Sequence, residues 1–263
     1  MDLKGKRVLL TGASGGLGRP LASLFIARGV SLVVIGRNAE SLQQLQRELE
    51  PGQVECVAGD ITDASFREQL AGLVADSGGL DLLVNLAGTN TFRTFETEDP
   101  DQLEAMFQTN LIAPVLLTRA LLPDMLQRGR GRIINIGSIL GSLGMPYFVT
   151  YCATKAGLQR FSEALRRELA DSPVGVTYIA PRAVRTAINS DAVYKMAKAT
   201  KMALDEPDQV AAQILQAIEN ERDEAYLGWP EKLFMRINAL LPGFIDRVTA
   251  KQTRETRRFA VDS

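Results

Sequence analysis

Tyr151 and Lys155 stand four residues apart in the segment YCATK, and Ser138 precedes Tyr151 by thirteen residues. A tyrosine and a lysine at this spacing share one face of a helix. A nearby ammonium group favours the charged form of a phenol and so lowers its pKa. Such a phenol can exchange a proton with an alcohol or a carbonyl near neutral pH. The pattern therefore predicts an acid–base pair, although the same spacing also occurs by chance on amphipathic helices.

The chain contains no histidine among its 263 residues, which excludes histidine-based triads and histidine-ligated metals. Its two cysteines, Cys56 and Cys152, form no CxxC motif and suggest no disulfide framework. Acid–base chemistry must then come from tyrosine, lysine, cysteine or a carboxylate. We predict no metal site.

A glycine-rich turn, TGASGGLG, spans Thr11–Gly18 directly after an apolar run and at the start of an amphipathic stretch. Gly12, Gly16 and Gly18 let the backbone turn sharply and approach a pyrophosphate closely, while the following helix N-terminus supplies amide donors. An ordinary structural turn is the alternative. Because the turn lies between a strand and a helix at the start of the chain, we predict dinucleotide binding.

The second predicted strand ends at Gly36, and Arg37 and Asn38 follow it. A carboxylate at this position would bind the adenosine ribose hydroxyls and favour NAD. Arginine instead matches a 2′-phosphate in charge and geometry. We therefore predict a preference for NADP(H) over NAD(H), with help from Ser14 and Asn38. A solvent-exposed arginine without this role is the alternative.

Further polar or small residues follow the other predicted strands. Asp60 follows the third strand and Asn85-Leu86-Ala87-Gly88 the fourth, and each is ordinary turn chemistry when taken alone. Asn110 lies within a long helical stretch, where asparagine is unfavourable unless its side chain has a partner. Ser138 ends the fifth strand, where its hydroxyl could hold a substrate oxygen or cap a turn.

Strands and helices alternate along the first two thirds of the chain. The predicted strands are Arg7–Thr11, Ser31–Gly36, Gln53–Val57, Leu80–Asn85, Gly131–Gly137, Val174–Ala180 and Glu224–Leu227. The predicted helices are Arg19–Arg28, Glu40–Glu50, Asp63–Ser77, Pro100–Arg128 with a bend at Pro114 or Pro123, Val149–Ala170 and Glu206–Glu221. Apolar strands between helices predict a parallel sheet covered on both faces, a single doubly wound Rossmann α/β domain.

Taken together, the sequence resembles the short-chain dehydrogenase/reductase family. The matching segments cover roughly residues 7–190 and are TGASGGLG, Asp60, NLAG at Asn85–Gly88, Asn110, Ser138, YCATK, and PRAVRT at Pro181–Thr186. The resemblance implies that Tyr151 is the general acid/base, that Lys155 lowers its pKa, that Ser138 binds the reacting oxygen and that Asn110 holds a water beside Lys155. It also implies a set of cofactor-binding residues: Gly12, Ser14, Gly16, Leu17, Gly18, Arg37, Asn38, Asp60, Ile61, Asn85, Ala87, Gly88, Tyr151, Lys155, Pro181, Val184 and Thr186.

Two positions depart from the family pattern. Leu86 replaces the second asparagine of the usual NNAG, and Arg182 replaces the glycine of the usual Pro-Gly after the sixth strand. A large side chain at Arg182 is expected to alter the entrance for the substrate.

The last part of the chain carries an apolar lid and an apolar, basic tail. Residues 1–228 form the predicted domain, with a lid at Ala187–Leu204, and residues 229–263 form a helical extension. Apolar residues recur at helical spacing between Leu233 and Val248 and are flanked by lysines and arginines. We expect this tail to pack on the protein or on a partner subunit; a membrane interface is the alternative.

The sequence as a whole predicts an NADP(H)-dependent oxidoreductase acting on a lipophilic carbonyl or secondary alcohol. The alternative is a nucleotide-sensing or membrane-surface binding module that uses the tail. A net charge of −1 gives no case for nucleic acid. Met1–Lys6 is short and polar, and Leu111–Leu126 is interrupted by Arg119 and Asp124, so we expect a cytoplasmic protein, with weak peripheral membrane contact as the alternative. The family resemblance implies a homodimer or homotetramer.

Overall fold

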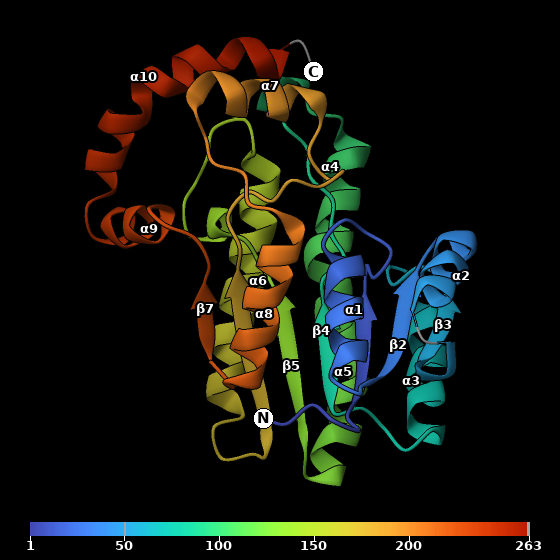
Figure 1. Cartoon of the computed structure of the whole chain (residues 1–263). Coiled ribbons are helices and arrows are strands. Elements are labelled where there is room, and N and C mark those ends of the chain that lie inside the picture. The colour runs from blue at the N-terminus through green and yellow to red at the C-terminus, as the bar shows by residue number, and fades with distance from the viewer. Residues whose placement is uncertain (50, 262–263) are drawn as a thin grey trace.

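The computed structural model describes residues 1–49 and 51–261. Seven strands form one sheet in the order β3-β2-β1-β4-β5-β6-β7, and every neighbouring pair is parallel (Figure 1). The strands are β1 Arg7–Thr11, β2 Ser31–Gly36, β3 Val54–Ala58, β4 Leu82–Asn85, β5 Gly131–Ile136, β6 Val174–Ala180 and β7 Glu224–Tyr226. The order of the strands reverses between β1 and β4, the place where doubly wound sheets bind their ligands.

Helices cover both faces of this sheet and its carboxyl end. They are α1 Gly18–Ala27, α2 Ala39–Glu48, α3 Ala64–Asp76, α4 Pro100–Phe107, α5 Ala113–Arg128, α6 Val149–Glu168, α7 Asp191–Thr200, α8 Pro207–Glu219, α9 Glu231–Leu240 and α10 Pro242–Val261. One core cluster joins the sheet to α1, α2 and α8, and a second joins it to α3 and α5. The predicted fold class is confirmed, and the predicted ends of the domain's elements agree within two residues, apart from Glu50, which lies outside the described residues.

Burial explains why the strands read as apolar runs. Leu9, Leu10, Leu82 and Leu83 are fully buried because both faces of a central parallel strand are covered. Each fully buried leucine contributes about 1.5–3 kcal/mol. The core therefore holds the carboxyl ends of β1, β4 and β5 at one edge of the sheet.

The long helical stretch Pro100–Arg128 is interrupted by a π-helical turn at Gln108–Ile112, ahead of the prolines at which we expected a bend. By length and composition alone, this stretch of 29 residues is long and apolar enough to cross a membrane, although it contains Arg119 and Asp124. The mean hydropathy of its most apolar window is 1.3. Leu117 and Leu121 of α5 pack in the core beneath the sheet, which accounts for part of the apolar composition.

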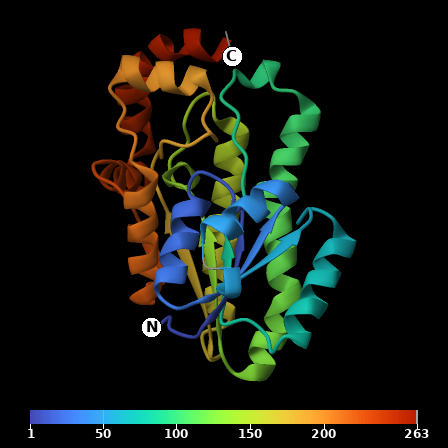
Figure 2. The same cartoon turned by 45° about the vertical axis from the view of Figure 1, so that its right-hand side comes forward.

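The tail forms two helices that meet at Leu240–Pro242 and fold back over the carboxyl end of the sheet (Figures 1 and 2). Helix α10 packs on α7, where Ala260 joins Val193 and Met196 in a third, smaller core cluster. The Tyr147 hydroxyl donates to the carbonyl oxygen of Thr253 at 2.9 Å. One side of the tail therefore covers the protein itself.

Candidate active site

A cavity of about 1110 Å³ lies at the carboxyl edge of the sheet, between the glycine turn, the start of α6 and the tail. The predicted cofactor residues that line it are Gly12, Ser14, Gly16, Leu17, Gly18, Arg37, Asp60, Ile61, Ala87, Gly88, Tyr151, Lys155, Pro181, Val184 and Thr186. Ser138 lines it as well. Asn38, Asn85 and Asn110 do not.

The glycine turn leaves no room for side chains. Gly12 has a φ of +69°, and a Cβ there would stand 2.9 Å from the Cα of Ala87. A Cβ at Gly18 would stand 2.2 Å from the carbonyl oxygen of Gly12, and one at Gly16 would stand 2.8 Å from the side chain of Thr186. These glycines therefore place no side chain over the backbone at the start of α1, which fits a dinucleotide pyrophosphate at a helix N-terminus.

Thr11 holds this turn against the loop after β4. Its hydroxyl oxygen accepts from the backbone N–H of Leu86 at 3.0 Å and of Ala87 at 3.1 Å. The hydroxyl is also 3.4 Å from the carbonyl oxygen of Val84. Our sequence analysis missed this role because the threonine looks like the last residue of an ordinary strand.

Arg37 lies exposed at the end of β2 and lines the cavity. Within the described part of the chain, no hydrogen bond or ion pair of its guanidinium is recorded. The Asn38 side chain instead caps α2, accepting from the backbone N–H of Ser41 at 2.9 Å. The arginine is therefore free to meet a phosphate, while the predicted contribution of Asn38 to phosphate binding has no support in its position.

Asp60 and Ile61 form the adjacent wall after β3. The carboxylate oxygen of Asp60 accepts from the backbone N–H of Thr62 at 2.9 Å and from its hydroxyl at 2.8 Å, which makes a local turn. Ile61 is buried beside it. Both residues line the same cavity as the glycine turn.

Asn85 requires a correction, because its side chain lies in the core rather than in the cavity. It is 4% exposed, and its amide donates to the side-chain oxygen of Asn135 at 2.8 Å and to the hydroxyl of Thr118 at 3.3 Å. Asn135 in turn donates to the hydroxyl of Ser162. This polar chain ties β4 and β5 to α5 and α6 beneath the site, and Ala87 and Gly88 line the cavity instead.

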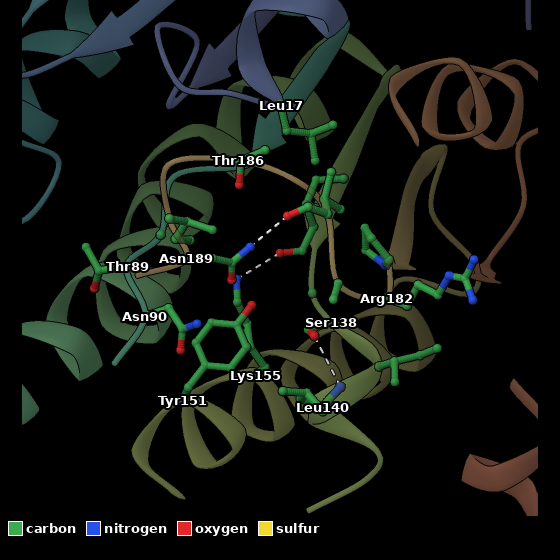
Figure 3. Close-up of a pocket in the computed structure, with 18 of the residues that line it drawn as sticks. Leu17, Thr89, Asn90, Ser138, Leu140, Tyr151, Lys155, Arg182, Thr186 and Asn189 are labelled. Carbon is green, nitrogen blue, oxygen red and sulfur yellow. Dashed lines mark hydrogen bonds between the residues drawn. The ribbon is translucent and has the colours of Figure 1, made fainter. Parts of the chain in front are cut away.

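Ser138, Tyr151 and Lys155 face the same space at the end of β5 (Figure 3). Tyr151 and Lys155 come from successive turns at the start of α6, and the Lys155 nitrogen lies 5.8 Å from the centre of the Tyr151 ring. Lys155 donates to the carbonyl oxygen of Ile136 at 3.1 Å. The Ser138 hydroxyl oxygen accepts from the backbone N–H of Leu140 at 3.1 Å.

Burial is the main cause of the pKa shifts of Tyr151 and Lys155. It raises the pKa of Tyr151 to about 12, although a hydrogen bond with Ser138 opposes the shift. Burial also lowers the pKa of Lys155 to about 8. The net shift is therefore opposite to the one expected from Lys155 alone, since desolvation of the phenol outweighs any effect of an ammonium 5.8 Å from the ring centre. At neutral pH the phenol is protonated and the lysine is mostly charged.

Tyr178 positions Ser138 by contacting its backbone, a role that sequence analysis missed. It is 1% exposed in β6; its hydroxyl donates to the Ser138 carbonyl oxygen at 3.2 Å and lies 3.4 Å from the Ser138 backbone nitrogen. Burial raises the pKa of Tyr178, so this hydroxyl keeps its proton. A buried aromatic residue in a strand gives no sequence signal of such a contact.

Asn110 lies in the π-helical turn and anchors the loop after β4. Its side-chain oxygen accepts from the backbone N–H of Thr89 at 2.8 Å, and its amide donates to the Thr89 carbonyl oxygen at 2.9 Å and to the Thr154 hydroxyl at 3.2 Å. A Cβ on Gly88 would lie 3.2 Å from the Asn110 oxygen and 3.6 Å from the Lys155 nitrogen. Asn110 and Lys155 thus both lie next to Gly88, and π-helical turns are frequent at functional sites.

Arg182, the departure from the family pattern, joins three segments around the cavity. Its guanidinium makes a double ion pair with Asp205, at 2.7 and 2.6 Å, and donates to the carbonyl oxygen of Trp229 at 2.9 Å. Gly228 has a φ of +103°, and a Cβ there would stand 2.6 Å from the Arg182 side chain. The arginine therefore ties the end of the lid to the start of the tail.

The far end of the cavity is largely apolar, and much of this wall was not predicted. It is lined by Ile139, Leu140, Leu143, Met145, Phe148, Val193, Met202, Trp229, Phe234, Ile245 and Val248. The last four come from the tail. Within the residues that the structure describes, no group of three or more acidic or cysteine side chains is arranged to hold a metal ion.

Comparisons with known proteins agree with this site. Residues 6–197 match the family described as short chain dehydrogenase. "Dehydrogenase/reductase SDR family member 7B" of Bos taurus is 33% identical, with 95% of this chain and 82% of the relative covered. "Ketoacyl reductase HetN" of a Nostoc species is also 33% identical, over 94% of this chain and 88% of the relative.

Solved structures show the same likeness. A short-chain dehydrogenase of Streptomyces avermitilis is 30% identical with a TM-score of 0.80, covering 96% of this chain and 99% of the other. A short chain dehydrogenase of Burkholderia cenocepacia, solved in complex with NADP, is 26% identical with a TM-score of 0.80, covering 94% and 98%. Because the family match spans residues 6–197 and relatives are 33% identical over nearly the whole chain, the chain belongs to the short-chain dehydrogenase/reductase family of NAD(P)-dependent oxidoreductases.

Proposed function

We propose that this protein is an NADP(H)-dependent reductase of lipophilic ketones. The observation that carries the proposal is a single cavity whose lining has three parts. Arg37 lies at one end, Ser138 and Tyr151 lie in the middle, and an apolar wall lies at the other end. The cavity therefore has a place for a 2′-phosphate, a proton donor and a lipophilic substrate.

The cofactor preference rests on charge and space at the end of β2. Gly36 carries no side chain that would block a phosphate, and a Cβ there would already lie 3.5 Å from the Ser14 hydroxyl. Arg37 supplies a planar cation of the kind that binds phosphate through two hydrogen bonds. The complex of the Burkholderia cenocepacia relative with NADP is consistent with this choice.

The protonation states favour reduction of a carbonyl. When bound, a nicotinamide cofactor supplies the hydride equivalent. Tyr151, protonated at neutral pH, donates its proton to the substrate oxygen, and the Ser138 hydroxyl orients that oxygen. The Lys155 ammonium stabilises the tyrosinate that remains.

The substrate class follows from the wall of the cavity. Leucine, methionine and phenylalanine side chains line the end beyond Ser138, and methionine adapts to apolar ligands of different shapes. One relative carries the name ketoacyl reductase, and a ketone in an apolar acyl chain is an example of this class. We propose a substrate with a ketone at Tyr151 and an apolar chain toward the tail.

The test is a panel of ketones of increasing apolar length, assayed with NADPH and with NADH by loss of absorbance of the reduced nicotinamide. We expect kcat/KM to rise with apolar length and to be higher with NADPH. No turnover of any ketone or secondary alcohol by purified protein would overturn the proposal. Equal kcat/KM with the two cofactors would overturn the NADP(H) preference alone.

A further inference from the structure

The junction of α9 and α10 exposes a group of large apolar side chains. Leu240 is 81% exposed, Leu241 62%, Phe244 52% and Val248 55%, and we call these four residues the α9–α10 corner. In Figure 1 this junction stands out from the body at the left of the view. Single exposed apolar residues are normal, but a contiguous group marks an interaction surface.

The cavity opens beside this corner. Trp229 is 68% exposed and Phe234 40%, yet both line the cavity, as does Val248 of the corner. Side chains that line a cavity and are also exposed must lie at its mouth. The apolar surface of the corner is therefore continuous with the apolar wall that we assign to the substrate.

The tail that carries the corner is basic. Residues 229–263 contain seven lysines and arginines against four aspartates and glutamates, in a chain whose net charge is −1. Arg236, Arg247, Arg254, Arg257 and Arg258 are exposed. Apolar side chains flanked by arginines on two helices are typical of a segment that lies in a membrane interface.

We propose that the α9–α10 corner docks on a bilayer containing anionic lipids and that the cavity mouth then faces the lipid. The corner side chains enter the boundary between headgroups and acyl chains, and the arginines contact the headgroup phosphates. A lipophilic ketone dissolved in the bilayer can then reach the cavity without crossing water. This last step rests on the proposed function, whereas docking itself does not.

Charge favours lipid over a second copy of the chain as the partner. Two copies that met at this corner through a twofold axis would bring the same exposed arginines together. Like charges at an interface oppose association, whereas an anionic lipid surface attracts them. The attraction is screened by salt, so docking is expected to be weak and sensitive to salt.

Vesicle sedimentation tests the docking with the full chain. The vesicles are phosphatidylcholine alone or phosphatidylcholine with phosphatidylglycerol. We expect sedimentation with the anionic vesicles at low salt, little with the neutral ones, and a fall as salt is raised. The triple variant Leu240→Ser/Leu241→Ser/Phe244→Ser should lower the partition coefficient about tenfold or more, because it removes the side chains that enter the bilayer.

Two further variants separate the apolar and charged contributions. Leu126→Ser is the matched control: Leu126 is 40% exposed, but it lies near the end of α5, at the opposite edge of the sheet, and its substitution should leave binding unchanged. Arg236→Gln/Arg254→Gln should lower binding to anionic vesicles about tenfold and leave the weak binding to neutral vesicles unchanged.

Several outcomes would overturn the docking proposal. They are no sedimentation with anionic vesicles, equal binding by the triple variant, or a change of oligomeric mass in the triple variant, measured by light scattering, without any vesicle binding. None of the three corner residues in that variant lines the cavity, so its turnover of a water-soluble ketone should match the unmutated protein. Loss of vesicle binding with retained turnover separates failure of docking from failure of the proposed function.

Discussion

At the scale of single residues, the site is governed by what burial does to a phenol and an amine. Tyr151 holds its proton more tightly than free tyrosine, and Lys155 holds its proton less tightly than free lysine. Near neutral pH the site therefore contains a neutral proton donor beside a cation. This state suits protonation of a ketone oxygen in the reductive direction.

Replacing Tyr151 by phenylalanine should lower kcat for ketone reduction roughly 10²–10⁴-fold, because we propose the phenol as the general acid. The ring can still pack, so NADPH affinity, measured by fluorescence titration, should stay within a few-fold of the unmutated protein. A variant that keeps more than half of the activity would contradict the assignment.

The pKa of Lys155 predicts a pH dependence of catalysis. The role that we propose for Lys155 needs its charged form, which is present below about pH 8 and lost above it, so kcat/KM for ketone reduction should fall as pH rises through this value. In Lys155→Arg the cation does not lose its proton. The remaining activity of that variant should show no fall near pH 8, and an identical fall in both proteins would refute the role of Lys155.

The proposed preference for NADP(H) depends on one exposed cation, Arg37. Arg37→Ala should weaken NADPH binding by about 1.5–3 kcal/mol, the contribution of hydrogen bonds to a charged group, and change NADH binding little. Arg47→Ala, an exposed arginine on α2, is the matched control and should affect neither cofactor. Calorimetric titration of both cofactors measures the difference, and equal weakening of the two would disprove phosphate recognition.

At the scale of elements, one arginine joins the segment after the lid to the start of the tail. Arg182 makes a double ion pair with Asp205 and donates a hydrogen bond to the carbonyl oxygen of Trp229. Removing one partner of a partly buried ion pair leaves the other charge without compensation. The order of α9 should therefore depend in part on this side chain, beside the hydrogen bond from Asn238 to the carbonyl oxygen of Ser142.

In Arg182→Ala we expect backbone amides of residues 229–240 to exchange with deuterium about tenfold faster, because the tail has lost its anchor. Arg185→Ala is the control, since the ion pair of Arg185 with Glu206 is exposed and contributes little. If exchange in residues 229–240 is the same in both variants, Arg182 does not hold the tail.

At the scale of the whole molecule, the tail completes both a core and a cavity. Ala260 and Ile245 are buried, and Trp229, Phe234 and Val248 form part of the cavity wall. The Rossmann domain supplies the cofactor edge and the proton donor, whereas the tail and α7 enclose the space for the substrate.

Truncation after Gly228 should therefore lower the melting temperature and raise KM for long apolar ketones more than KM for a short water-soluble ketone. The reason is that truncation uncovers α7 and removes one wall of the cavity. The triple serine variant of the corner should keep the melting temperature, because its side chains are exposed. Thermal unfolding and steady-state kinetics measure both effects, and unchanged stability and KM after truncation would mean that the tail contributes to neither.

Much of the fold and of the site could be predicted from the sequence, because their determinants are local. Apolar runs between helical stretches predict a covered parallel sheet, and Gly18 is required within the glycine turn itself, because a Cβ there would meet the carbonyl oxygen of Gly12. The spacing of Tyr151 and Lys155 on α6 likewise follows from helix geometry alone.

Only the tertiary structure decided what surrounds each side chain. Asn85 points into a polar network of the core, Thr11 holds the glycine turn, and burial raises rather than lowers the pKa of Tyr151. The same holds for the tail, whose helical spacing predicts an apolar stripe but not that one side packs on α7 while the other is exposed beside the cavity mouth. Periodicity and turn chemistry depend on neighbours in the chain, whereas desolvation, long-range hydrogen bonds and enclosure depend on segments that meet only when the chain folds.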